Sequence, residues 1–356
     1  MEHNSFSCFL GANSRYGFRS LYSGFCSPEK GCWLNIIKGG PGCGKSSFMK
    51  RIASAAEGHG LAAERVFCSG DPDSLDGVFI PALAVGYVDG TAPHSMDCPY
   101  PAACGSYIDL GRFYDTDALH GKKDTIMELN TRYKALYADA YRQISAGAAM
   151  LPKYETGLWG NSEKDTLRKK LDAFIKRDLV KGAAEGGKIL GECFLGALSC
   201  KGQVFLEGSL KGYEKLCMLD NSLGMGHYFL DSLLGGALKA GHDLIVCRDF
   251  LDPELISGLL IPGASLAVFC SDSGIDSGRE LYRRLRLDNL VPRASLAAFR
   301  PALRRSARLG RDCLSFASET LAEAKALHDE LEAVYNPHVD FDGVYSEAER
   351  HIARLF

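Results

Sequence analysis

The sequence predicts an α/β protein made of two tandem three-layer α/β/α units with helical extensions. Three observations lead to this fold class. A glycine-rich loop near residue 40 joins a strand-type segment to a helix-type segment, a nine-residue motif recurs 185 positions later, and 356 residues suffice for two domains. We expect the first domain to span 1–185 and the second to span 186–356.

The composition is that of a globular protein. Lys and Arg number 41 against 44 Asp and Glu, and hydrophobic residues make up 46% of the chain. This balance excludes a mainly disordered or fibrous chain and one that coats nucleic acid through bulk charge. No apolar run has the length of a membrane helix, and the first residues do not have the pattern of a signal peptide. The 13 cysteines never follow Cys-x-x-Cys spacing, so we expect a cytoplasmic protein that does not enter membranes.

The first element is a strand, loop and helix around residues 39–46, Gly-Gly-Pro-Gly-Cys-Gly-Lys-Ser, which satisfy G-x-x-x-x-G-K-[ST]. The mostly apolar segment 33–38 precedes the loop as a strand. The segment after Ser46 has a helical pattern, with Phe48 and Ile52 on one face. This context favours a phosphate loop, and hence the P-loop NTPase type of fold, over a turn that merely joins two elements.

The chemistry of such a loop defines a nucleotide site. Glycines allow backbone N–H groups to turn toward a phosphate, and the helix N-terminus adds its dipole. Lys45 would bridge β- and γ-phosphate oxygens, and the Ser46 hydroxyl would ligate Mg²⁺. We therefore predict ATP and Mg²⁺ as cofactors. The predicted binding residues are Gly40, Pro41, Gly42, Cys43, Gly44, Lys45, Ser46 and Ser47.

The next elements are two strand-type segments that end near an acid. Residues 83–88 are mostly apolar and lead to Asp89, which we predict to serve Mg²⁺ or to orient a water. Asp71 follows the shorter segment 65–68 and is the alternative, because acids at the carboxyl ends of neighbouring strands are equivalent candidates. In the proline-rich loop beyond, His94 and Asp97 could act as acid–base or orienting residues or could be plain structural partners.

An internal repeat divides the chain. Residues 9–17 and 194–202 agree at six of nine positions, and the pairs Asp71-Pro72 and Ile80-Pro81 recur 181 positions later. The two halves therefore have about 180 residues each. At an offset of 182, Lys45 and Ser46 fall opposite His227 and Tyr228, and at 181 Asp89 falls opposite Cys270. The second phosphate loop is therefore predicted to be degenerate, with binding of a different anion as the alternative.

The remaining segments are predicted to be helical. Residues 105–150 carry an apolar stripe with helical spacing that indicates a core face, and 161–181 form a charged, solvated helix. Residues 314–335 form an amphipathic helix that ends before Pro337, and a short helix closes the chain. Ten arginines lie between Arg279 and Arg311. They could act as an arginine finger, bind a phosphorylated substrate or contact nucleic acid, or they could simply be solvated helix surface; nucleic acid is not favoured.

The sequence resembles a poorly characterised group of bacterial tandem P-loop proteins described as ATPases or nucleotide-kinase-like proteins. The resemblance extends over nearly the whole chain. Members often have an intact second loop, from which His227 and Tyr228 depart. The group implies ATP binding and hydrolysis, without an established substrate. The motifs that carry the resemblance are 9–12, 38–47, 71–76, 80–81, 89–94, 107–111 and 327–332.

Three functions follow from these residues. The leading one is hydrolysis of ATP by in-line attack of water, with Lys45 and Asp89 as catalytic residues and with Ser46 and Asp89 at the metal. The second is a nucleotide or small-molecule kinase in which the loop 93–101 and the arginine segment bind an acceptor. The third is an ATP-gated module whose second half docks a protein partner.

Overall fold

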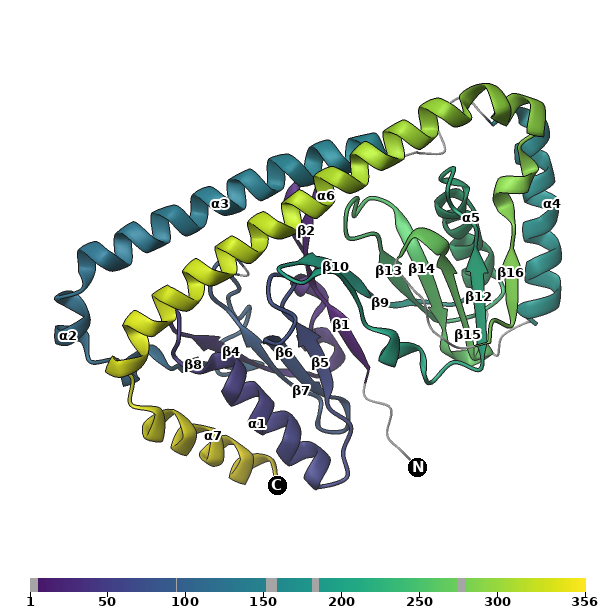
Figure 1. The fold of residues 1–356 in the computed structure, drawn as a ribbon. Helices are drawn as coiled ribbons and strands as arrows, with labels where there is room; N and C mark the ends of the chain where they lie inside the picture. The colour runs from purple at the N-terminus through teal and green to yellow at the C-terminus, as the bar shows by residue number, and fades with distance from the viewer. Residues whose placement is uncertain (1–5, 94, 152–158, 181–185, 274–279) are drawn as a thin grey trace.

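The computed structural model describes residues 6–93, 95–151, 159–180, 186–273 and 280–356. It is an α/β fold with two mixed six-stranded sheets (Figure 1). The first sheet has the order β1 (Ser7–Phe9), β5 (Glu64–Phe67), β6 (Leu75–Ile80), β7 (Val85–Asp89), β4 (Trp33–Lys38) and β8 (Gly105–Asp109). The second has the order β9 (Ile189–Cys193), β13 (Leu244–Arg248), β14 (Ile256–Ile261), β15 (Leu266–Cys270), β12 (Lys215–Leu219) and β16 (Arg283–Leu285).

The two sheets share one topology. In each, the third strand in the order (β6 or β14) is antiparallel to both neighbours, and the other pairs are parallel. Each half also has a hairpin after its first strand. These hairpins are β2 (Gly11–Ser14) with β3 (Gly17–Ser20), and β10 (Gly196–Ser199) with β11 (Gly202–Phe205).

Two long helices, α3 (Lys123–Met150) and α6 (Arg293–Tyr335), lie side by side over the first half, and one of them, α6, continues over the second (Figure 1). The predicted helix 105–150 is wrong in its first part, because 105–109 form β8, which pairs with β4. The helix predicted at 314–335 begins earlier, at Arg293, and continues through Pro301. No helix within the described ranges has the length and apolarity to cross a membrane.

One face of the first sheet is covered by α1 (Lys45–Gly58) and α7 (Phe341–Leu355), and one face of the second by α4 (Asn161–Asp178) and α5 (Met225–Lys239). The short helix α2 (Thr116–His120) precedes α3 and lies away from both sheets (Figure 1). Phe48 of α1 and Val344 of α7 share a core with the first sheet, and Phe174 of α4 and Phe229 of α5 share one with the second. Two helices therefore pack on the sheet of the other half. Helix α4 precedes the second sheet in the chain and packs on it, whereas α7, at the end of the chain, returns to the first sheet (Figure 1).

The opposite faces of the two sheets contribute to one shared core. This cluster contains Ile36 of β4, Met218 of β12, and Tyr22 and Leu210 from connecting segments, but no residue of an α-helix. The expected three layers, with helices on both faces of each sheet, are therefore wrong for the residues the structure describes. The physical reason is that the inner faces of the two sheets are buried by strands and connecting segments of both halves.

Equivalent backbone groups join the halves reciprocally. Phe9 and Phe194 each donate an N–H to the other's carbonyl, at 2.8 and 2.9 Å. Arg15 N–H in the first hairpin donates to Leu251 O at 3.0 Å, and Cys200 N–H in the second donates to Gly70 O at 3.2 Å. Each hairpin thus reaches the loop after β5 or β13 in the opposite half.

Candidate functional site

The phosphate-type loop, residues 39–44, lies between β4 and α1 at the carboxyl end of β4. Gly42 and Gly44 have φ values of +68° and +84°, in the left-handed region that favours glycine. Gly44 is also the N-cap of α1. A Cβ at Gly42 would lie 2.5 Å from the Asn336 side chain, so this turn has no room for a larger residue.

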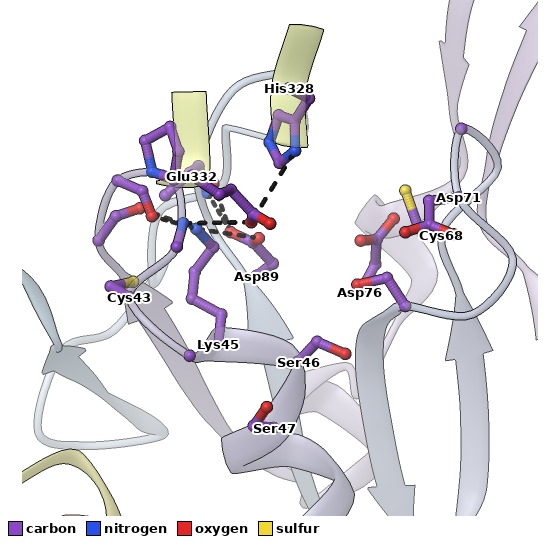
Figure 2. Close-up of a pocket in the computed structure, with 18 of the residues that line it drawn as sticks. Cys43, Lys45, Ser46, Ser47, Cys68, Asp71, Asp76, Asp89, His328 and Glu332 are labelled. Carbon is purple, nitrogen blue, oxygen red and sulfur yellow. Dashed lines mark hydrogen bonds and ion pairs between the residues drawn. The ribbon is translucent and has the colours of Figure 1, made fainter. Parts of the chain in front are cut away.

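Lys45 lies folded back over this loop (Figure 2). Its Nζ donates to Gly39 O at 3.0 Å and to Gly40 O at 2.9 Å. The same nitrogen lies 3.7 Å from Asp89 Oδ2, and both side chains are largely buried. The ammonium group of Lys45 therefore lies over the loop, where two backbone carbonyls and the Asp89 carboxylate hold it.

Asp89 is the last residue of β7, which runs parallel to β4 and places Asp89 opposite Ile37. Its Oδ1 accepts from Thr91 N–H at 2.8 Å and from Thr91 Oγ1 at 2.6 Å. These two bonds fix the carboxylate so that Oδ2 faces Lys45. The local pattern of an apolar strand closed by an acid therefore places Asp89 beside the loop.

Asp71, the alternative acid, lies on the other side of the same cavity (Figure 2). It follows β5 in a loop and lies 3.5 Å from Lys325 Nζ. Next to it, buried Asp76 accepts a hydrogen bond from the Tyr22 hydroxyl at 3.1 Å. Burial, followed by the negative charge of Asp76, raises the pKa of Tyr22 well above its usual value. Sequence reasoning missed Asp76 because it is the second residue of an apolar strand, β6.

Ser46 faces this acidic side. Its Oγ accepts the N–H of Leu75, the first residue of β6, at 2.9 Å. Figure 2 shows the Ser46 hydroxyl directed toward Asp76, whereas Ser47 turns away from it. A serine hydroxyl and nearby carboxylates are hard oxygen donors, which is the donor set that Mg²⁺ prefers.

The loop opens into a cavity of about 590 Å³ that includes parts of three distant helices. Sequence reasoning missed these helical residues, because they lie far from the loop in the chain. The sequence signals there were the apolar stripes in 105–150 and 314–335 and the motif 327–332, and none of them indicated contact with the loop. The lining side chains from α3, α6 and α7 are Tyr133, Tyr137, Lys325, His328, Glu332, Phe341 and Tyr345.

Glu332 of α6 contacts the phosphate loop directly. Its Oε1 accepts the Gly42 N–H at 3.2 Å, which is the kind of backbone donor that such a loop offers to a phosphate oxygen. His328 Nδ1 lies 3.8 Å from the same oxygen. Burial lowers the pKa of His328 from its usual value, so its neutral imidazole form is favoured beside the loop.

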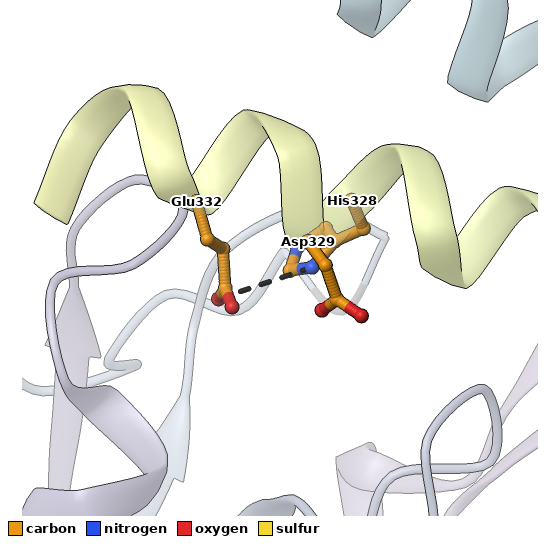
Figure 3. A group of neighbouring side chains, drawn as sticks. All are labelled: His328, Asp329 and Glu332. Atoms are coloured by element: carbon orange, nitrogen blue, oxygen red, sulfur yellow. Dashed lines mark ion pairs between the residues drawn. The ribbon is translucent and has the colours of Figure 1, made fainter.

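His328, Asp329 and Glu332 form a group on α6 that could hold a metal ion, with one ligand atom from each within 4.8 Å of the others (Figure 3). Their side chains already have partners. Glu332 accepts from Gly42, and Asp329 pairs with Lys325. These contacts give the group a structural role over the loop, so we assign it no metal.

Two further predictions have different outcomes. His94 lies outside the described residues. Asp97 has a side chain that is 89% exposed, lies 3.7 Å from Lys38, and is not part of the cavity. Among the arginines that the structure describes between 280 and 311, Arg283 pairs with Asp178 at 2.6 Å, and none lines the cavity. The described part of this segment therefore provides no arginine finger to the loop.

The corresponding loop of the second half, 220–224, is one residue shorter. Its Gly224 is the N-cap of α5 with φ +78°, like Gly44 of α1. Cap geometry thus puts Met225, rather than His227, in the position of Lys45. Cys270 pairs with Leu219 as Asp89 pairs with Ile37.

Carboxylates from neighbouring segments contact this second loop. The Asn221 amide nitrogen lies 2.8 and 2.9 Å from the Asp272 carboxylate oxygens. Asp288 Oδ2 accepts the Ser222 N–H at 3.1 Å. The Asp288 carboxylate therefore occupies one backbone donor that a phosphate could use, and Met225 stands where the first loop has Lys45.

Comparisons of the chain with protein-family models, curated proteins and solved structures found no match. The proposal below therefore uses only the fold and the site geometry.

Proposed function

We propose that the protein is an Mg²⁺-dependent P-loop NTPase that binds ATP at the first loop and hydrolyses it. One observation carries the proposal: Lys45 lies over loop 39–44 and faces Asp89, 3.7 Å away at the end of the adjacent parallel strand, at the mouth of a cavity of about 590 Å³. A cavity of this size suits a nucleotide. A cation, glycine N–H groups and a helix N-terminus together favour a polyphosphate.

Ser46 and Asp89 would hold the Mg²⁺. Ser46 provides a hydroxyl at the start of α1, and Asp89 provides a carboxylate that Thr91 orients. When bound, the ion would neutralise charge on the phosphate oxygens. Asp71 remains the alternative ligand, because it lines the same cavity.

In the proposed reaction, a water attacks the γ-phosphorus in line with the bond to the β,γ-bridging oxygen. That bond breaks, the water oxygen joins the phosphate, and its protons pass to solvent and product, giving ADP and inorganic phosphate. Lys45 stabilises the charge that accumulates on the β- and γ-phosphate oxygens. We further propose that the halves are copies of one unit whose phosphate chemistry persists only in the first.

A kinase is the second candidate, and one observation favours it. The cavity extends past Ser46 to a side lined by Asp71, Asp76 and Tyr137, where an acceptor with hydroxyl groups would find hydrogen-bonding partners. Phosphate release from ATP alone supports the hydrolase. Transfer that occurs only when a hydroxylated acceptor is added supports the kinase.

The test uses Lys45→Ala. The wild-type chain should gain thermal stability with Mg-ATP and release phosphate, and Lys45→Ala should lose both effects while keeping the melting temperature of the ligand-free protein within a few degrees. Lys50→Ala, an exposed lysine on the same helix, serves as the control and should behave as wild type. A stabilisation by Mg-ATP that survives in Lys45→Ala contradicts the proposed site.

A further inference from the structure

We infer that the base of the bound nucleotide packs against the rings of Phe341 and Tyr345 on α7. This inference rests on the proposed function and adds to it a subsite for the nucleobase. Both rings are half-buried and line the cavity that contains the phosphate loop. No part of the predicted phosphate chemistry uses them.

The orientation of α1 sets the direction of the nucleotide. Ser46 faces β6 and the acidic side of the cavity, where its Oγ accepts the Leu75 N–H. A helix turns 100° per residue, so Ser47 points elsewhere, as Figure 2 shows. The γ-phosphate and metal belong beside Lys45, Ser46 and Asp89. The nucleoside must therefore extend away from the acidic side, across Gly44 and Ser47.

Aromatic rings lie at that end. A Cβ at Gly44 would lie 3.7 Å from the Phe341 ring, so Phe341 lies directly beside the start of α1. The Phe341 and Tyr345 rings are nearly parallel, at 27°, with centroids 6.2 Å apart. They are four residues apart and therefore share one face of α7. Two adjacent ring faces next to a polyphosphate site suit a flat heterocycle.

The packing of α7 on α1 holds both rings, and Tyr345 has a further contact. Val344 and Ala348 of α7 are fully buried in the core that they share with α1. The Arg51 guanidinium of α1 lies 4.2 Å from the Tyr345 ring centroid, a cation–π geometry. The position of the rings is thus set by the packing of α7 on α1 before any ligand binds.

The opposite end of the cavity has its own tyrosines, Tyr133 and Tyr137 of α3. Their rings contact each other at 4.9 Å between centroids. They lie with Asp71 and Asp76 around the acidic side, which Ser46 and the metal-bound end of the polyphosphate would face. We therefore assign the base to α7, and Tyr133 becomes a test of the assignment.

The experiment measures affinities for Mg-ATP and for magnesium tripolyphosphate, which lacks the nucleoside. Phe341→Leu and Tyr345→Leu should each weaken ATP binding about tenfold, the size expected for loss of one stacking contact. Neither should change tripolyphosphate binding. Phe356→Leu is the matched control, because this aromatic follows the same helix and stacks on His59 with centroids 4.1 Å apart. It should leave both affinities unchanged.

The outcomes separate this inference from the proposed function. Unchanged ATP affinity in both α7 variants, or equal losses for ATP and tripolyphosphate, overturns the base subsite. A loss confined to ATP in Tyr133→Leu overturns it too. A wild-type chain that binds neither ligand overturns the proposed function itself. If the α7 variants fail to fold, 2-aminopurine riboside triphosphate bound to the wild type decides: stacking should quench its fluorescence, and unquenched bound probe contradicts the inference.

Discussion

Among single residues, Glu332 holds the Gly42 N–H that a phosphate oxygen would use. A bound nucleotide must therefore displace this carboxylate or add negative charge next to it. We predict that Glu332→Gln strengthens Mg-ATP binding about fivefold, roughly 1 kcal/mol, because a neutral amide competes less well for the N–H and repels phosphate less. Titration calorimetry measures the change.

The control for this prediction is Glu330→Gln, an exposed glutamate on the same helix. It should leave the affinity for Mg-ATP within about twofold of wild type, since Glu330 lies outside the cavity and the charge of an exposed side chain is largely screened by salt. Unchanged or weaker binding in Glu332→Gln contradicts the view that the carboxylate occupies the phosphate position.

The two candidate metal acids can be separated by their magnesium dependence. Asp89 is oriented by Thr91 and faces Lys45, whereas Asp71 pairs with Lys325 across the cavity. Asp89→Asn should therefore raise the magnesium concentration needed for half-maximal ATP binding by about tenfold, and Asp71→Asn should change it little. The reverse result would make Asp71 the metal ligand.

Local sequence patterns predicted the site residues whose positions depend on their neighbours in the chain. Lys45 and Ser46 follow a glycine-rich loop, and Asp89 closes an apolar strand. The contacts of Glu332 and Phe341 with the loop region could not be predicted, because they depend on where α6 and α7 return to the first sheet. That return depends on packing between segments some 300 residues apart, which a local pattern does not encode.

Among the elements, α7 links stability to the site. His351 of α7 is buried against the Tyr87 hydroxyl and the Phe48 ring, and its Nε2 lies 3.6 Å from Glu347. Burial lowers the pKa of His351 in spite of the nearby Glu347 carboxylate. The folded protein then binds this proton more weakly than the unfolded chain does.

The consequence is a loss of stability in acid. As the pH falls below the ordinary histidine pKa of about 6.5, the contribution of His351 to the free energy of unfolding should start to decrease. It is lost in full only below the lowered pKa that His351 has in the folded protein. Urea unfolding at pH 7.5 and pH 5.5 measures the difference, and His351→Gln should make it smaller. The same pH difference in wild type and variant would show that His351 does not titrate in the folded protein as described.

Several elements show why the periodicity of apolar residues alone did not predict the type and the bounds of each element. The apolar stripe predicted within 105–150 was right at Leu129, which is buried in α3, but Tyr133 and Tyr137 of the same helix line the cavity. Residues 105–109 form β8 because β4, on its other side from β7, offers backbone partners at the sheet edge. The start of α6 was missed because its first turns are largely exposed and rich in arginine, so no apolar stripe marks them.

In the whole molecule, the two sheets have one topology, and equivalent backbone groups join the halves in both directions. The predicted tandem organisation was based on nine-residue similarity and repeated offsets. That the halves are copies of one unit stays a prediction, with which the shared strand order agrees. The packing of α4 on the second half and of α7 on the first could not be predicted, because the local apolar pattern of a helix does not say which sheet it covers. Helix α6, which follows the second sheet in the chain, lines part of the cavity at the first loop.

The central claim is that one nucleotide binds per chain, at the first loop. Lys45 and Asp89 have no counterparts in the second half, where Asp272 and Asp288 contact the loop region. Calorimetric titration of the full chain with Mg-ATP tests this most directly. We predict one bound nucleotide per wild-type chain and none in Lys45→Ala. Two nucleotides per chain, or one that persists in Lys45→Ala, would contradict the account.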